Sequence, residues 1–317
     1  MAEIMTMGEI IVEIMRPGED QPLYETGTFR GPFPSGAPAI FIDTVARLGH
    51  SAAIVGGVGD DDFGKCLVDR LSGDGVDCSC VIKNDRISTG CAFVTYFSGG
   101  ERKFIFHIGN TPAVLAPAPD DEKLRGLKFF HVMGCSLMAN TEFGMRIRDT
   151  AVRAKSFGAK VSFDPNVRPE LLKDPAAMEL IASVLDNTSV FMPGKSELRM
   201  LSGKEDIEEA VEALFAAKPL LEIIALKNGK KGCIIYKRDS APFAFGVYDI
   251  PPVDATGAGD SFDGAFLCGL CEGLDTEAAA KLATAAASLN TGAFGPMEGD
   301  ISVENVKRLI AENKLEK

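Results

Sequence analysis

The chain has 317 residues, 46% of them hydrophobic, with a formal net charge of -12 at pH 7 and a pI near 4.9. This length allows a large core, and the acidity argues against nucleic acid or an anionic membrane surface as a partner, because both require a clustered basic face. We therefore expect a small-molecule partner. Since no charged-then-apolar signal segment opens the sequence and no run of 18 apolar residues occurs, we also expect a cytoplasmic protein.

Strands and helices alternate along most of the sequence. Early strands are predicted at 8–15 and 23–31, and a strand at 51–59 precedes a helical pattern at 63–75. This alternation of apolar runs, helical patterns and glycine-bearing turns is typical of β-α units around a mostly parallel sheet. The predicted fold class is therefore α/β.

Residues 90–108, with the sequence GCAFVTYFSGGERKFIFHI, interrupt this rhythm. They read as two strands joined at Ser98-Gly99-Gly100, which is a hairpin signal. Together with the early strands, over approximately residues 10–31, the hairpin can form a small separate sheet that serves as a lid. An ordinary antiparallel edge of the main sheet is the alternative.

The second half of the chain returns to β-α units. A helix at 150–158 leads into a strand at 159–164, and further strands are predicted at 189–193 and 222–229, before a helix that begins near Ser261. These units extend the same mostly parallel sheet.

The segment VDATGAGDSFDGAF, at 253–266, carries the strongest chemical signal. Asp260 precedes apolar residues at helical spacing, so one interpretation is a helix N-cap. The other interpretation is catalytic. Gly257, Ala258 and Gly259 would leave bare amides at a helix N-terminus, where a phosphate binds, and a carboxylate beside them could accept the proton of an attacking hydroxyl. That arrangement suits phosphoryl transfer.

Competing motifs are weaker. The triplet beginning at Gly194 lacks the glycine that a P-loop has five residues earlier, where this chain has Ser189, and no G-x-G-x-x-G follows an early strand. Cys268 and Cys271 have no second cysteine pair or histidines at ligand spacing, so we expect reduced, buried thiols rather than a metal site.

At these motifs the sequence resembles the ribokinase-like, or PfkB, family of sugar kinases. The resemblance rests on GPFPSGAPAIFIDTVARLG at 31–49 and on VDATGAGDSFDGAF, with VGGVGDDDFG, SFDPNVRP, MPGKSEL and ALKNGKKG between them. It implies a single kinase domain over residues 1–317, with a three-layer α/β/α body, a mostly parallel central sheet and a small β-sheet lid. It also implies ATP and Mg²⁺, K⁺ in members that a monovalent cation activates, and a homodimer through the lid.

The resemblance assigns a role to each matching residue. Asp260 looks like the base that deprotonates the sugar, with Gly257, Ala258 and Gly259 as the anion hole. Substrate contacts are implied for Glu13, Ser35, Gly36, His107 and Arg168, nucleotide contacts for Lys227, Gly229 and Thr256, magnesium through water for Glu197, and potassium for Asp254. Glu13 as a solvated strand residue, Arg168 as a surface ion-pair partner and Glu197 as an exposed acid at a helix start are the structural alternatives.

Three departures from the family pattern bear on the substrate. Ile40 and Gly194 stand where the family has asparagine, so part of the sugar and magnesium networks must differ. His107 stands near the position where kinases of 2-keto-3-deoxygluconate carry an arginine for the substrate carboxylate, and a neutral imidazole does not replace that cation. The sequence therefore favours a neutral hexose, in particular the ketohexoses tagatose and fructose.

Other functions stay open. A kinase of 2-keto-3-deoxygluconate, of ribose or of a nucleoside is the alternative among enzymes. The alternative outside enzymes is a sugar-binding regulatory protein that has kept the fold without turnover.

Overall fold

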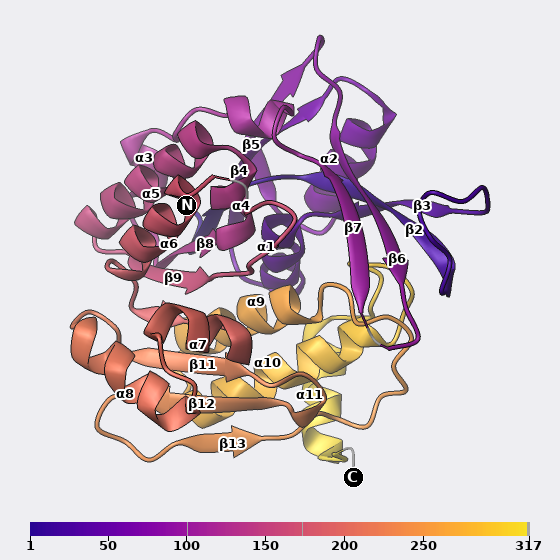
Figure 1. Cartoon of the computed structure of the whole chain (residues 1–317). Helices are drawn as coiled ribbons and strands as arrows, with labels where there is room; N and C mark the ends of the chain where they lie inside the picture. The colour runs from indigo at the N-terminus through magenta and orange to yellow at the C-terminus, as the bar shows by residue number, and fades with distance from the viewer. Residues whose placement is uncertain (100, 173, 316–317) are drawn as a thin grey trace.

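The computed structural model describes residues 1–99, 101–172 and 174–315, whose strands form two sheets. The larger sheet has nine strands in the order β13-β12-β11-β10-β9-β8-β1-β4-β5, and the smaller has four in the order β3-β2-β6-β7. Figure 1 shows the smaller sheet projecting from one side of the body. The α/β fold class is confirmed, and the hairpin is part of a separate lid sheet rather than an edge of the main sheet.

The main sheet is parallel from β5 to β11, and β12 and β13 extend it antiparallel at one edge. Its strands are β1 (Ile4–Met7), β4 (Ala52–Gly59), β5 (Asp77–Asn84), β8 (Phe129–Met133), β9 (Lys160–Asp164), β10 (Val190–Phe191), β11 (Ile223–Lys227), β12 (Cys233–Lys237) and β13 (Phe243–Phe245). Every residue of β1, β4 and β8 is buried, as expected for parallel strands covered on both faces.

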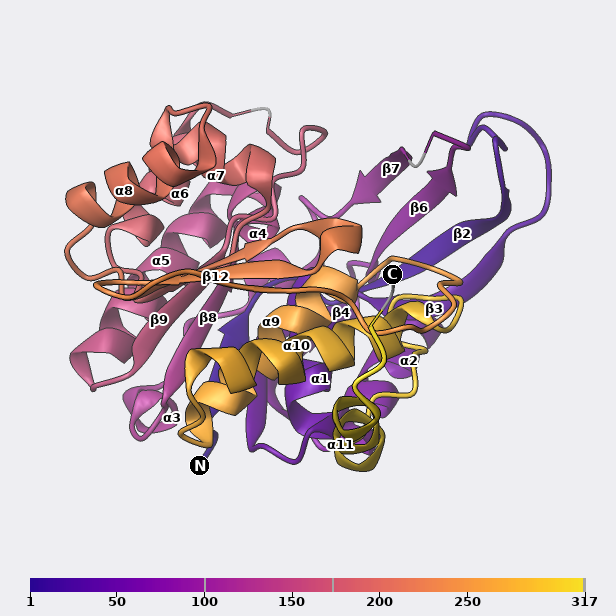
Figure 2. The ribbon, with the colours of Figure 1, turned by 90° about the horizontal axis from the view of Figure 1, so that it is seen from below.

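Helices cover both faces of the main sheet. In Figure 2, α1, α9, α10 and α11 lie across one face, and α5, α6, α7 and α8 lie across the other. The helices are α1 (Ala37–Arg47), α2 (Asp62–Gly73), α3 (Asp121–Leu124), α4 (Gly134–Ala139), α5 (Thr141–Ser156), α6 (Ala176–Leu185), α7 (Lys195–Ser202), α8 (Ile207–Ala217), α9 (Ala258–Cys271), α10 (Thr276–Thr291) and α11 (Val303–Glu312), with short 3₁₀ turns η1 (Pro112–Leu115) and η2 (Gly229–Lys231).

The lid sheet is built around the predicted hairpin. Its strands are β2 (Ile11–Glu19), β3 (Arg30–Ser35), β6 (Gly90–Tyr96) and β7 (Arg102–His107). Strands β6 and β7 pair antiparallel, which confirms the hairpin, although Gly100 of its predicted turn lies outside the described residues. The buried apolar cluster of the lid has only three members, Ile11, Ala92 and Ile108, whereas the body holds the large core.

The predicted strand at 23–31 is wrong over most of its length, because pairing begins only at Arg30, with β3. The buried guanidinium of Arg16 donates hydrogen bonds to carbonyl oxygens of the loop between β2 and β3, at 2.9 Å to Pro22 and 3.2 Å to Thr28. These bonds give the loop's carbonyl oxygens hydrogen-bond partners in place of a neighbouring strand. Local β propensity does not report such a contact with a side chain outside the segment.

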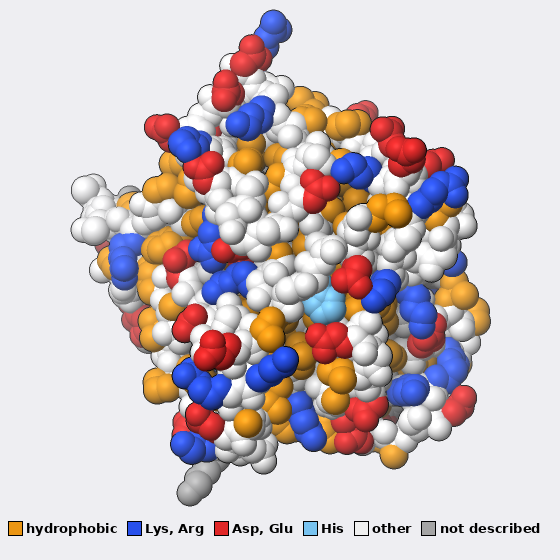
Figure 3. Space-filling view, turned by 180° about the vertical axis from the view of Figure 1, so that it is seen from behind, with side chains coloured by type: hydrophobic (Ala, Val, Ile, Leu, Met, Phe, Trp, Pro, Cys, Tyr) orange, Lys and Arg blue, Asp and Glu red, His pale blue; other side chains and the backbone are white. Residues whose placement is uncertain are grey.

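The surface in Figure 3 carries side chains of both charges. On the face that Figure 3 shows, basic and acidic side chains are interspersed, with hydrophobic side chains between them. That face has no clustered basic area of the kind that a nucleic-acid backbone binds. No helix within the described ranges is both long enough and apolar enough to cross a membrane.

Candidate active site

Helix α9 begins at Ala258, three residues before the predicted start, and Gly257 is its N-cap. Gly257 has a φ of 78°, and a Cβ at this position would lie 2.3 Å from the carbonyl oxygen of Pro296. Both the backbone conformation and the close contact therefore require glycine. No side chain caps this helix, and the amide of Ala258 donates only a long hydrogen bond, of 3.4 Å, to the carbonyl oxygen of Ala255, so this helix N-terminus can accept an anion.

Asp260 lies in the first turn of α9 and not at its N-cap, so the capping interpretation is wrong. Its Oδ1 accepts a hydrogen bond of 3.0 Å from Nδ2 of Asn166. Burial and the nearby carboxylate of Asp164 raise the pKa of Asp260 to about 6, against the opposing effect of Lys227 and two arginines. A carboxylate with this pKa is mostly ionised at pH 7 and is well matched to take a proton.

Asn166 was not predicted as a site residue, although it belongs to the segment SFDPNVRP. It follows β9 at the carboxyl edge of the sheet, and its φ of 39° is in the left-handed region that asparagine tolerates. Its backbone amide donates to Oδ1 of Asp164 at 3.1 Å, which closes the turn and directs its side chain to Asp260. An asparagine just after a buried strand was the available signal.

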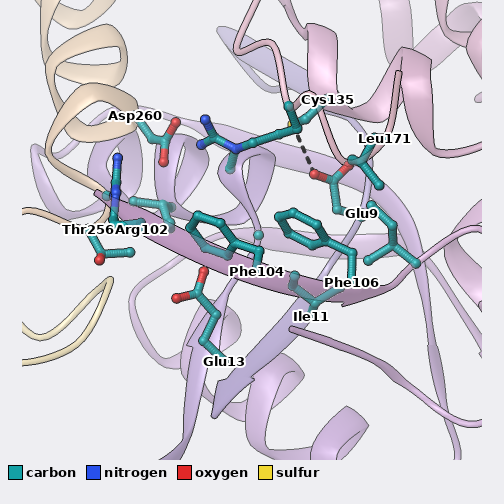
Figure 4. Close-up of a pocket in the computed structure, with 16 residues that line it drawn as sticks. Glu9, Ile11, Glu13, Arg102, Phe104, Phe106, Cys135, Leu171, Thr256 and Asp260 are labelled. Carbon is teal, nitrogen blue, oxygen red and sulfur yellow. Dashed lines mark hydrogen bonds between the residues drawn. The ribbon is translucent and has the colours of Figure 1, made fainter. Parts of the chain in front are cut away.

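A pocket lies beside Asp260, between the lid and the body. Figure 4 shows Arg102, Thr256 and Asp260 at one end of it and Glu9 with Cys135 at the other. Strands β2 and β7 line the lid side, and the loop before α9 lines the body side. Of the predicted residues, the structure brings together Glu13, Gly36, Arg168, Thr256, Gly257 and Asp260 in this lining.

Strand β7 presents one face to the pocket. Because side chains alternate along a strand, Arg102, Phe104 and Phe106 point into the pocket while His107 points away from it. The ring of His107 is exposed and lies edge-on to Phe93, with 6.2 Å between centroids. The structure therefore does not bring His107 to the site. A neutral imidazole at position 107 thus gives no reason to exclude an acidic substrate. The two-residue period of β7 could have identified Arg102.

Glu13 lies on β2 in the pocket wall. Its Oε1 accepts a hydrogen bond of 2.7 Å from the hydroxyl of Ser35. Its Oε2 is buried and has no hydrogen-bond partner among the described residues. Burial raises the pKa of Glu13 to about 7. The side chain is therefore neither a solvated strand residue nor fully satisfied, and a ligand hydroxyl would supply the missing donor.

Glu9 is a second pocket carboxyl, and sequence reasoning missed it. It accepts hydrogen bonds from Sγ of Cys135 at 3.1 Å and from the hydroxyl of Ser136 at 2.5 Å, and burial raises its pKa. A Cβ on Gly36 would lie 2.7 Å from the carbonyl oxygen of Glu9, at a φ of 104°. The glycine thus allows the start of α1 to approach the backbone before β2.

Lys227 lies beside the anion hole, inside the body. Its ammonium donates hydrogen bonds to Asp164 at 2.6 Å and to Asp263 at 3.0 Å. Burial disfavours the charge, but the two carboxylates outweigh it and raise the pKa of Lys227. A Cβ on Gly259 would lie 3.7 Å from this ammonium. Gly229, by contrast, lies in η2, the exposed turn of the β11-β12 hairpin, and does not reach the pocket.

Glu197 caps helix α7. Its two oxygens accept hydrogen bonds of 2.7 Å from the backbone amides of Gly194 and Val167. Burial, followed by the charge of Asp164, raises the pKa of Glu197. Since both oxygens are engaged, this carboxylate fits Mg²⁺ through a water rather than as a direct ligand.

Asp254 is buried and contacts Thr256. One of its oxygens accepts hydrogen bonds from the backbone amide of Thr256 at 2.9 Å and from its hydroxyl at 2.8 Å. Thr256 in turn lies in the pocket wall, directly before the N-cap of α9. Asp254 therefore shapes the loop that delivers the anion hole.

Comparison with known proteins shows which family and which solved structures this chain is similar to. A model of the pfkB family of carbohydrate kinases matches residues 1–302. A protein of Arabidopsis thaliana named probable fructokinase-2 is 34% identical over 268 residues, which cover 83% of this chain and 80% of that protein.

Solved structures have the same fold. The crystal structure of an E. coli protein assigned provisionally as a ribokinase II, in complex with ATP and Mg²⁺, has a TM-score of 0.91 and 35% identity, over 99% of this chain and 100% of that one. A fructokinase double mutant from Vibrio cholerae O395, with fructose, ADP and a potassium ion bound, has a TM-score of 0.82 and 24% identity, over 98% of each chain. The latter likeness concerns the fold alone.

Proposed function

The chain belongs to the pfkB family of carbohydrate kinases, and from this premise we propose that it transfers the γ-phosphoryl group of ATP to a hydroxyl of a neutral ketohexose, fructose or tagatose. One observation carries the proposal. Asp260 stands in the first turn of α9, beside the open amides, and at the same time in the wall of the pocket that the lid covers. A base in this position can serve a hydroxyl on one side and a phosphoryl group on the other.

In the proposed reaction, a sugar hydroxyl gives its proton to Asp260 as its oxygen bonds to the γ-phosphorus, and the bond to the leaving ADP oxygen breaks. The amides of Gly257, Ala258 and Gly259 stabilise the charge on the transferring group. The ammonium of Lys227 lies close to Gly259 and balances the carboxylates of Asp164 and Asp263 beside the anion hole. Mg²⁺ bound with ATP would neutralise phosphate charge, with Glu197 holding it through water.

The sugar contacts follow from the pocket wall. The free Oε2 of Glu13 would accept a sugar hydroxyl, with Ser35 fixing the carboxylate and Gly36 giving room. Phe104 and Phe106 offer an apolar surface for the C–H face of a sugar ring. Fructokinases among the relatives favour a ketohexose.

A second substrate class is favoured by a specific observation. Arg102 and Arg168 both line the pocket, and a pair of guanidinium groups is the usual partner of a carboxylate. A sugar acid such as 2-keto-3-deoxygluconate is therefore the second candidate. Asp260 in the same wall weighs against it, because this carboxylate is mostly ionised at pH 7 and would repel the carboxylate of a sugar acid.

A coupled ADP-release assay on fructose, tagatose, ribose, adenosine and 2-keto-3-deoxygluconate tests the proposal. We expect the highest kcat/KM for a ketohexose. Turnover of the keto acid alone would replace the ketohexose by the second candidate. Absence of turnover with every sugar, together with a sugar-dependent rise in Tm, would indicate the regulatory sugar-binding protein instead.

We further propose that residues 1–317 act as a single domain, in the cytoplasm, and as a homodimer through the outer face of the lid. Tyr24 and Ile105 support the dimer, because they expose 84% and 44% of their surface on the lid. Light scattering of the full chain tests it, and the Ile105→Glu variant should then be monomeric.

A further inference from the structure

Asp254 is surrounded by hydrogen-bond donors from three parts of the chain. Besides Thr256, which donates twice to its Oδ1, the hydroxyl of Tyr96 donates to Oδ1 at 2.8 Å and the backbone amide of Gly295 donates to Oδ2 at 3.1 Å. Asp254 is only 6% exposed. Both of its oxygens are therefore occupied by donors of the protein itself.

Two backbone carbonyl oxygens nearby also accept hydrogen bonds. Nδ2 of Asn290 donates hydrogen bonds to the carbonyl oxygens of Thr256 at 2.8 Å and Pro296 at 3.1 Å, and Asn290 is fully buried. The amide nitrogen thus joins the loop before α9 to the loop after α10. Among the side-chain atoms of this group, Oδ1 of Asn290 is buried and has no partner in the described chain.

This arrangement does not fit the potassium ion that the family resemblance places at Asp254. An alkali cation needs several oxygens with free lone pairs, and it is repelled by N–H and O–H groups that point at the same oxygens. Here Oδ1 of Asp254 accepts three hydrogen bonds, Oδ2 accepts one and the carbonyl oxygen of Thr256 accepts one, so a cation at Asp254 would have to displace these donors.

Tyr96 is the one donor in this group that comes from the lid. It lies at the end of β6, and its hydroxyl also contacts the hydroxyl of Thr256. Burial and the charge of Asp254 raise the pKa of Tyr96, so its hydroxyl keeps its proton at neutral pH. Since Thr256 directly precedes the N-cap Gly257, the hydroxyl links the position of the lid to the first amides of α9.

We propose that Tyr96 takes the place of a monovalent cation at Asp254, so that lid contact rather than K⁺ orders the anion hole and turnover does not depend on K⁺. The proposal rests on the kinase function proposed above. Tyr96 is a positioning residue in it, because it acts through Asp254 and Thr256 and does not contact the reacting atoms.

The first experiment compares kcat of the wild-type chain, with the Tris salt of ATP and MgCl₂, in KCl and in tetramethylammonium chloride at equal ionic strength. We expect the two values to agree within about twofold, which corresponds to about a third of the free energy of a tenfold rate change. Activation by KCl of about tenfold or more would overturn the proposal.

The second experiment uses Tyr96→Phe, which keeps the ring and removes only the hydroxyl, with Tyr24→Phe on the same lid as the matched control. In tetramethylammonium chloride, Tyr96→Phe should lose about tenfold in kcat, as expected for one buried hydrogen bond to a charged group, and Tyr24→Phe should match the wild type. KCl should recover part of the loss in Tyr96→Phe alone. Equal rates for the two variants, or a loss that KCl does not recover, would overturn the role of Tyr96.

A third measurement needs no turnover and so separates this proposal from the kinase function. The Tm of the wild-type chain without nucleotide should be the same in KCl and in tetramethylammonium chloride, because a cation that binds only the folded chain would raise it. A rise in Tm specific to KCl would overturn the proposal, whichever sugar the enzyme phosphorylates.

Discussion

The lid and the body contribute to the site in different ways. The body supplies Asp260, Asn166 and Gly257 from the ends of buried elements, and each is fixed by a hydrogen bond or a close backbone contact. The lid supplies Glu13 and Arg102 from a four-stranded sheet whose own apolar cluster has three residues. Groups that must be placed accurately for chemistry are thus in the rigid part, and groups that select the sugar are in the part with less internal support.

This division predicts different kinetic signatures. Substitutions in the body should lower kcat, because they remove interactions made in the transition state. Substitutions on the pocket face of the lid should act mainly through KM, because they remove contacts with the bound sugar. The variants below test this difference, from the largest expected effect to the smallest.

Asp260→Asn should lower kcat by about 10²–10⁴-fold, the usual cost of losing a general base, with little change in the KM for sugar. Steady-state kinetics with the preferred sugar measures this. The variant should unfold at the same temperature as the wild type or higher. The raised pKa means that the folded state disfavours the charge of Asp260 at pH 7, so removing the charge does not destabilise it. Retention of more than about a tenth of wild-type kcat would exclude Asp260 as the base.

Arg102→Ala should lower kcat/KM by about tenfold or more, mainly through KM, because hydrogen bonds to charged groups contribute about 1.5–3 kcal/mol. His107→Ala, on the opposite face of the same strand, is the matched control and should stay within about twofold of the wild type. If His107→Ala caused the larger loss, the pocket face of β7 would be assigned incorrectly.

Asn166→Ala should lower kcat by about two- to tenfold at pH 7, because a hydrogen bond to a charged group contributes about 1.5–3 kcal/mol, which corresponds to about one to two pKa units. The hydrogen bond from Asn166 favours the ionised form of Asp260, so its removal should raise the pKa of Asp260 above its present value of about 6. The defect should therefore shrink when the assay is moved to pH 8. A defect that is independent of pH would mean that Asn166 does not act through Asp260.

Local patterns in the sequence predicted much of the body. The β-α alternation gave the class of the main sheet, and the segment around Asp260 gave the helix start and its open amides, because both depend on residues close in sequence. The helix begins at Ala258 rather than near Ser261, because Gly257 is its N-cap and has a left-handed backbone conformation. The preference of N-caps for Asp instead predicted a start after Asp260.

The lid was harder to predict because its contacts join residues that no single local pattern contains. The loop before β3 is held by Arg16, and nothing local in 23–31 distinguishes such a loop from a strand. His107 and Arg102 lie on opposite faces of one strand, so choosing the wrong face of β7 places the wrong side chain in the pocket. The nucleotide role of Lys227 came from the family resemblance, and the sequence did not show that its ammonium pairs with Asp263, which is 36 residues away.

The most direct test of the central claim uses the pH dependence of kcat/KM, which reports the ionisation of the free enzyme and needs no change at the catalytic residue. Asp260 must be deprotonated to act, and burial raises its pKa to about 6, so kcat/KM should fall about tenfold per pH unit below that value. Glu13, with a pKa of about 7, could add a second transition, and Glu13→Gln removes it. The account predicts that Glu13→Gln keeps the acid limb with an apparent pKa of about 6. A kcat/KM that stays constant from pH 7.5 down to about 5 in this variant would contradict Asp260 as the base.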